Sequence, residues 1–129
     1  MINPSKQRGL FFKEIVMGYR SEVGFACSQK DYLSLAKQME DKGFNLFDIA
    51  SDTDTFQLDG EWWTWFRWES LRWYKCYEDV QIIMNFMNNP DNKFQFIRLG
   101  EDYEDPPEVI NPMDECDWFG VYRSVDVNI

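Results

Sequence analysis

The chain has 129 residues, of which 44% are hydrophobic and 18% aromatic, and it carries a formal net charge of −10 with no histidine. This length and aromatic content are sufficient for the core of one ordinary domain, which excludes general disorder. The acidic balance disfavours direct binding to nucleic acids or anionic membranes, and the lack of histidine removes the commonest general base and metal ligand.

The cysteines and the apolar segments indicate the compartment. Cys27, Cys76 and Cys116 are odd in number, widely spaced and outside any CxxC pair, so we expect free thiols in a reducing environment. Leu10–Phe12 is too short for the apolar region of a signal peptide, and no stretch approaches the ~20 apolar residues of a membrane span. We therefore predict a cytoplasmic protein that does not contact a membrane.

The first strand and helix follow an N-terminal segment of different character. Residues 1–16 are predicted to be an arm or extension, and residues 17–129 a single α+β domain. Gly18–Cys27 alternates as a strand. Ser28 is a favourable helix cap, and Gly43 after Lys42 is typical of a helix end, so a helix is predicted between them.

The middle of the chain predicts a hairpin. Phe44–Ile49 is a short apolar strand or a connection, and Ser51–Thr55 is turn-like. Asp59-Gly60 suits a type I′ turn between a strand ending at Leu58 and a second strand that is dense in tryptophan. Both faces of that second strand begin with aromatic residues. We expect either a central strand covered on both sides or one that is half exposed to a partner.

The second half of the chain predicts another helix and two strands. The helix begins at Tyr77 and stops at Asn88–Pro90, and a strand follows at Phe94–Leu99. An acidic, proline-bearing loop then leads to a closing strand at Phe119–Val127. The predicted fold class is α+β, with a mainly antiparallel sheet, two helices on one face and the order β-α-β-β-α-β-β, a ferredoxin-like variant.

No pattern predicts catalysis. Phosphate-binding glycine loops are absent, and the loop carboxylates do not have the spacing of an EF-hand calcium site. Glu61 and Glu69 beside tryptophans are reminiscent of a glycosidase cleft, but no barrel or long cleft accompanies them. We predict no enzyme activity, no cofactor and no metal site.

The strongest functional feature is the acidic loop, which holds eight acids and no base between Gly100 and Asp117. Such a loop favours a partner protein with a basic surface. Aromatic side chains would supply an apolar anchor. The predicted partner-binding residues are Glu101, Asp102, Tyr103, Glu104, Asp105, Glu108, Asp114, Glu115, Asp117, Trp62 and Trp65.

Three motifs resemble small acidic proteins of tailed bacteriophages. They are MGYRSEV at Met17–Val23, WxxxxWYxxYxxV at Trp68–Val80 and FIRLGED at Phe96–Asp102. The resemblance covers about Met17 to Asp105 and implies no residue-level activity. It implies a non-enzymatic protein that binds and disables a host protein, for example a restriction or CRISPR effector.

Two alternatives stay open at the level of sequence. A small-molecule or nucleotide-signal binder would use an aromatic pocket with arginines as anion contacts. A structural accessory protein would form a homo-oligomer through the tryptophan strand as an association edge. The candidate anion contacts are Arg20, Arg67, Arg72, Arg98 and Arg123.

Overall fold

The computed structural model describes residues 19–102, 104–113, 115–121 and 125–127. The predicted N-terminal arm, residues 1–16, lies outside the described residues. Within them the helices and strands, in chain order, are β1 (Ser21–Ser28), α2 (Gln29–Asp41), β2 (Asp52–Leu58), β3 (Glu61–Leu71), α3 (Glu78–Asn88), β4 (Phe94–Gly100), β5 (Glu108–Ile110), β6 (Phe119–Val121) and β7 (Val125–Val127).

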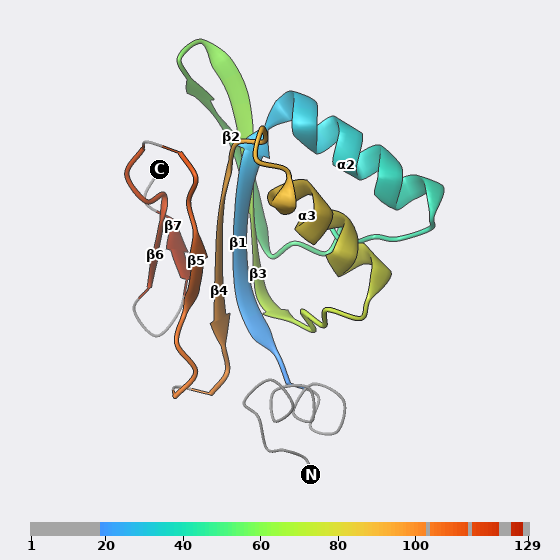
Figure 1. Ribbon diagram of the computed structural model, residues 1–129, viewed down its shortest axis with the longest axis vertical. Coiled ribbons are helices and arrows are strands. Elements are labelled where there is room, and N and C mark those ends of the chain that lie inside the picture. The colour runs from blue at the N-terminus through green and yellow to red at the C-terminus, as the bar shows by residue number, and fades with distance from the viewer. Residues whose placement is uncertain (1–18, 103, 114, 122–124, 128–129) are drawn as a thin grey trace.

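The main sheet confirms the predicted α+β class. Its strand order is β2-β3-β1-β4-β5, and each neighbouring pair is antiparallel. The first four strands with α2 and α3 have the ferredoxin-like split βαβ order, to which β5 adds one strand. Both helices lie on one face of this sheet, and β6 and β7 lie on the other side (Figure 1). Neither helix is long and apolar enough to cross a bilayer in the described part of the chain.

The predicted helix and turn signals are confirmed by their geometry. The Asp31 N–H donates to Ser28 Oγ at 3.2 Å, which caps α2. Gly43 has φ 77°, and the Phe44 N–H donates to Met39 O at 2.9 Å, which completes a Schellman end. Asp59 and Gly60, at φ 51° and 80°, form the turn between β2 and β3.

The helices and one face of the sheet enclose the larger core, and we call this side of the sheet the helix face. Phe25 on β1 contacts Phe86 on α3 edge to face, and both contact Phe94 on β4. Trp68 is 2% exposed and its Nε1–H donates to Leu46 O at 2.9 Å. Burial of these large rings is the principal stabilisation of the helix layer.

The opposite side of the sheet, the second face, has its own core. Ala26, Trp63 and Ile97 are covered there by Trp118 and Phe119, which belong to the C-terminal segment. Gly24 permits the close approach, because a Cβ at that position would lie 2.8 Å from the Phe119 ring. The sheet therefore has α2 and α3 on one side and a small two-stranded sheet on the other.

Three predicted elements are corrected. The predicted closing strand, Phe119–Val127, is wrong as one strand, because β6 and β7 pair with each other as two antiparallel strands of a separate sheet. The predicted acidic loop contains β5, which pairs with β4. Ser51–Thr55 is not all turn, because β2 begins at Asp52, where Thr53 and Thr55 align with Phe66 and Thr64.

The tryptophan-rich strand, β3, is an interior strand of the sheet. This agrees with the first of the two sequence expectations, a central strand. β3 has β2 on one side and β1 on the other. The prediction that this strand forms an association edge is therefore wrong, because its backbone groups pair within the sheet. The outer strand on that side is β2.

Candidate functional site

The predicted acidic loop does not form one patch, because β5 divides it. β5 aligns Glu108 with Arg98 and Ile110 with Phe96, so it runs back along β4. Residues 101, 102, 104 and 105 lie beyond the Gly100 end of β4. Residues 115–117 lie at its other end, where Gln95 Nε2 donates to Cys116 O at 3.1 Å. The five residue steps of β4 from Gln95 to Gly100 separate the two groups by roughly 17 Å.

Two acids of the first group fold the turn that carries them. The Tyr19 hydroxyl donates to Asp105 Oδ2, and the Asp102 N–H donates to the same hydroxyl at 3.3 Å. The Glu104 N–H donates to Asp102 Oδ1 at 3.0 Å. Asp102 and Asp105 are half-buried in these bonds, whereas Glu101 and Glu104 are exposed.

Other predicted loop residues have internal roles as well. Glu108 accepts from Arg98 Nε at 3.1 Å, and Arg98 Nη1 also donates to Ser21 Oγ at 3.1 Å. Asp117 accepts from Asn111 Nδ2 at 2.8 Å, and Glu115 is exposed beside it. Tyr103 and Asp114 lie outside the described residues.

The two predicted tryptophan anchors differ in exposure. The Trp62 side chain is 52% exposed near the tip of the β2–β3 hairpin. Trp65 is half-buried and packs at the margin of the second core. Of this pair, Trp62 is the more exposed ring.

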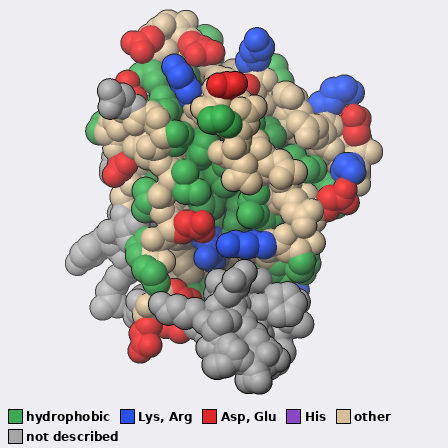
Figure 2. All heavy atoms as spheres, viewed as in Figure 1, with side chains coloured by type: hydrophobic (Ala, Val, Ile, Leu, Met, Phe, Trp, Pro, Cys, Tyr) green, Lys and Arg blue, Asp and Glu red, His purple; other side chains and the backbone are tan. Residues whose placement is uncertain are grey.

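The sequence prediction missed an acidic segment around that ring. Residues 43–66 hold five acids and no base, with Asp48 and Asp52 followed by three more on the hairpin. In the described residues no Lys or Arg forms an ion pair with Asp54, Asp59 or Glu61. Red acidic side chains lie at the upper end of the molecule in Figure 2, over the hairpin tip.

A second carboxylate group lies at the opposite end of the second face. It surrounds Arg67, whose guanidinium lies 3.6 Å from Glu22, 3.2 Å from Asp52 and 3.4 Å from Glu69. The Arg67 side chain is only 19% exposed. Three carboxylates thus lie within 4 Å of one guanidinium.

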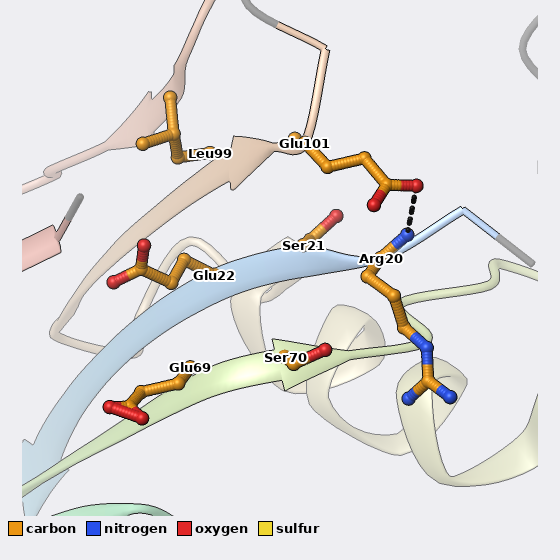
Figure 3. A pocket seen from close by; sticks show the side chains of 8 residues that line it. Arg20, Ser21, Glu22, Glu69, Ser70, Leu99 and Glu101 are labelled. Carbon is orange, nitrogen blue, oxygen red and sulfur yellow. Dashed lines mark hydrogen bonds between the residues drawn. The ribbon is translucent and has the colours of Figure 1, made fainter. Parts of the chain in front are cut away.

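A shallow cleft of about 290 Å³ extends this group toward the β4–β5 turn. Glu22, Glu69 and Glu101 line it (Figure 3), and Glu22 and Glu69 project to the same side of the sheet. The Arg20 N–H donates to Glu101 Oε1 at 3.3 Å. The three glutamates of the cleft and two aspartates of β2 form a group that we call the acidic band. Its members are Asp54, Asp52, Glu69, Glu22 and Glu101.

The band has the chemistry of a cation-binding surface. Its carboxylates can accept hydrogen bonds from guanidinium and ammonium groups. In the described part of the chain no group of three His, Cys, Asp or Glu is arranged to hold a metal ion. Burial raises the pKa of the Cys27 thiol far above its usual range, which opposes formation of a nucleophilic thiolate there.

The arginines proposed for an anion pocket do not converge on one within the described residues, and Arg20 lines the acidic cleft instead. Arg67 and Arg98 form ion pairs with acids of neighbouring strands. Arg72 is exposed, and Arg123 lies outside the described residues.

Comparison with known proteins yields no match for this chain among family models, curated proteins or solved structures.

Proposed function

We propose that this chain is a non-enzymatic binding protein that docks its acidic surface on a basic surface of a second protein and blocks it. One observation carries the proposal. Asp54, Asp59 and Glu61 form no ion pair with Lys or Arg among the described residues, and Glu22, Asp52 and Glu69 lie around one half-buried arginine, Arg67. Uncompensated carboxylates on a rigid sheet attract a complementary cationic surface and speed the encounter with it.

The arrangement supports a particular kind of target. Acids at alternate positions of a strand, such as Asp52 and Asp54, are spaced about 7 Å apart on one face. Proteins that bind nucleic acid present rows of Lys and Arg to a regular series of phosphates. We propose that the target is such a protein. On the resemblance to tailed-phage proteins, we further propose that this target is a host protein, in particular a defence factor of the restriction or CRISPR type.

Affinity capture followed by charge neutralisation tests this function. The chain is immobilised and exposed to bacterial lysate at low salt, and retained proteins are eluted with increasing salt and identified by mass spectrometry. A captured nucleic-acid-binding protein is then purified, and its affinity and its own activity are measured with the wild-type chain. We expect binding that weakens with salt and a loss of the target's nucleic-acid binding.

Two matched double variants locate the surface. Asp52→Asn with Asp54→Asn removes two charges from the band but keeps the oxygen that accepts from the Thr55 N–H. Glu40→Gln with Asp91→Asn removes two exposed charges elsewhere. We expect the first pair to weaken binding by about tenfold and the second by less than about twofold. Equal affinities for the two variants would contradict the proposed surface.

A further inference from the structure

Among the described residues, no strand pairs with the outer edge of β2. β2 is the terminal strand of the main sheet, and five of its seven residues are exposed. The hairpin that contains it extends beyond the sheet in Figure 1. Natural edge strands are commonly protected by Lys, Pro or a covering segment. β2 contains neither Lys nor Pro.

The hairpin register shows which backbone groups point outward. A two-residue turn makes Leu58 and Glu61 a hydrogen-bonded pair, and alternation continues along the strands. The backbone groups of residues 52, 54, 56 and 58 therefore face β3. Those of Thr53, Thr55 and Gln57 face away from the sheet.

One hydrogen bond supports this assignment. The Thr55 N–H donates to Asp54 Oδ1, the carboxylate of its own neighbour, at 2.8 Å. A backbone N–H that paired with another strand would not need this acceptor. The contact is consistent with an outer edge that has no neighbouring strand.

The charges on β2 select the kind of strand that can join it. Asp52 and Asp54 lie on the second face, while Thr53, Thr55 and Gln57 lie on the helix face. A second copy of β2 would bring further acids onto the same face without any base, which disfavours self-pairing. A basic strand would place Lys or Arg beside these carboxylates.

We propose that the outer edge of β2 accepts an extended basic segment of the partner as an additional strand, with Lys or Arg at alternate positions facing Asp52 and Asp54. This inference rests on the proposed function and assigns a binding mode to it. Backbone pairing along Thr53–Gln57 supplies affinity, and the acids supply selectivity.

Trp62 lies beside this edge on the helix face, on the side opposite to Asp52 and Asp54. Trp62 is aligned with Gln57. Its side chain therefore lies on the helix face, like those of the β2 residues whose backbone groups point away from the sheet. Half of the ring is accessible to solvent. The side chains of the added strand that alternate with its Lys or Arg would point to the helix face, where one at the end of the strand would meet this ring.

A pair of peptides tests the inference directly. The first is an eight-residue peptide that alternates Lys and Thr, and the second has the same sequence with every backbone amide N-methylated. Methylation keeps the charge but removes all strand-forming donors. We expect the first peptide to bind at least about tenfold more tightly than the second, and to slow hydrogen exchange of the Thr53 and Gln57 amides, followed by NMR.

Two variants at one position complete the test. Thr55→Pro removes an outward N–H and places a ring on the edge, whereas Thr55→Val keeps the N–H. We expect the proline to weaken peptide binding at least about tenfold and the valine less than about twofold. The exchange measurement on the wild-type chain does not depend on how well either variant folds.

The outcomes separate this inference from the proposed function. Equal, salt-dependent binding of both peptides, or no protection of Thr53 and Gln57, would overturn strand addition and leave charge-based docking intact. Unchanged affinity of the Asp52→Asn and Asp54→Asn double variant for the captured partner would contradict the proposed function, even if the unmethylated peptide occupies the edge.

Discussion

The rings of Trp63 on β3 and Trp118 before β6 lie edge to face, with centroids 5.5 Å apart. Phe56 of β2 completes the group, with its ring centroid 5.1 Å from that of Trp118. The Trp118 N–H also donates to Gln95 Oε1 at 2.8 Å. These contacts attach the C-terminal segment to three strands of the main sheet.

Trp118→Ala should destabilise the protein by about 3–5 kcal/mol, because it removes a large buried ring from the second core. Urea denaturation followed by circular dichroism measures the change. Trp118→Phe keeps an aromatic contact and should cost less, on the order of 1–2 kcal/mol. A loss below about 1 kcal/mol for the alanine variant would show that the C-terminal segment is not integral to the fold.

Gly24→Ala should destabilise the same interface from the sheet side. The added Cβ would lie 2.8 Å from Phe119 Cδ1 and 3.1 Å from Ile97 Cγ2, so the aromatic ring must move. We expect a cost of about 1–3 kcal/mol in the free energy of unfolding.

A double-mutant cycle identifies the clash as the cause. Phe119→Ala removes the ring, so Gly24→Ala should cost less in that background than in the wild type, with a coupling of roughly 0.5–3 kcal/mol. Additive effects of the two substitutions would mean that something other than Phe119 limits the space at Gly24.

The sequence predicts the part of the fold from β1 to β4 well because the signals there are local. Ser28 and Gly43 bound a helix through their own hydrogen bonds and dihedral angles, and Asp59-Gly60 specifies its turn. Such features depend on a few neighbouring residues and not on contacts with distant parts of the chain.

The C-terminal part could not be predicted in the same way. β5, β6 and β7 have three residues each, which is too short for a periodic pattern. β5 is held in part by Arg98, which pairs with Glu108 on the neighbouring strand. Composition identified Glu108 as a loop acid, but only the strand pairing shows that its charge is used internally.

The candidate site was partly predictable for the same reason. Trp62 is exposed and its role as an anchor stays a prediction, whereas Asp52 and Asp54 were interpreted as part of a turn. Their significance depends on β2 being an outer strand. That fact follows from the pairing of β3 with β1, which joins residues about 40 positions apart in the chain.

The three cysteines should differ in reactivity. Cys27 is buried and Cys76 and Cys116 are exposed, and all three are free thiols. A thiol reagent such as DTNB should modify two thiols in the native protein and all three in denaturant. Cys76→Ser and Cys116→Ser should each remove one rapidly reacting thiol, and Cys27→Ser should leave the native count unchanged. Rapid native modification of Cys27 would contradict its burial.

Cys27 should also make stability fall with alkaline pH. Burial raises the pKa of its thiol, so the unfolded chain loses this proton first, near pH 8.5. Its contribution is complete below that pH and is lost as pH rises, at up to about 1.4 kcal/mol per pH unit. Urea denaturation between pH 7 and 10 measures the slope. Cys27→Ala should lack this component, and an unchanged slope would assign the dependence to other groups.

Trp62 and Trp63 are adjacent in the chain but should respond oppositely to substitution. Trp62 is 52% exposed and Trp63 is 3% exposed, because successive residues of β3 face opposite sides of the sheet. Trp62→Ala should change the free energy of unfolding by less than about 0.5 kcal/mol. Trp63→Ala should cost about 3–5 kcal/mol.

Binding should reverse the order of importance. If Trp62 is an interface anchor, Trp62→Ala should weaken binding to the captured partner by at least about 2 kcal/mol, or roughly thirtyfold. Calorimetric titration of the purified partner measures this, with Leu33→Ala as the control because Leu33 is a similarly exposed apolar residue on α2. Equal effects of the two substitutions would remove Trp62 from the interface. A selective loss at Trp62 would place the partner at the hairpin, where Asp54, Asp59 and Glu61 form no ion pair among the described residues.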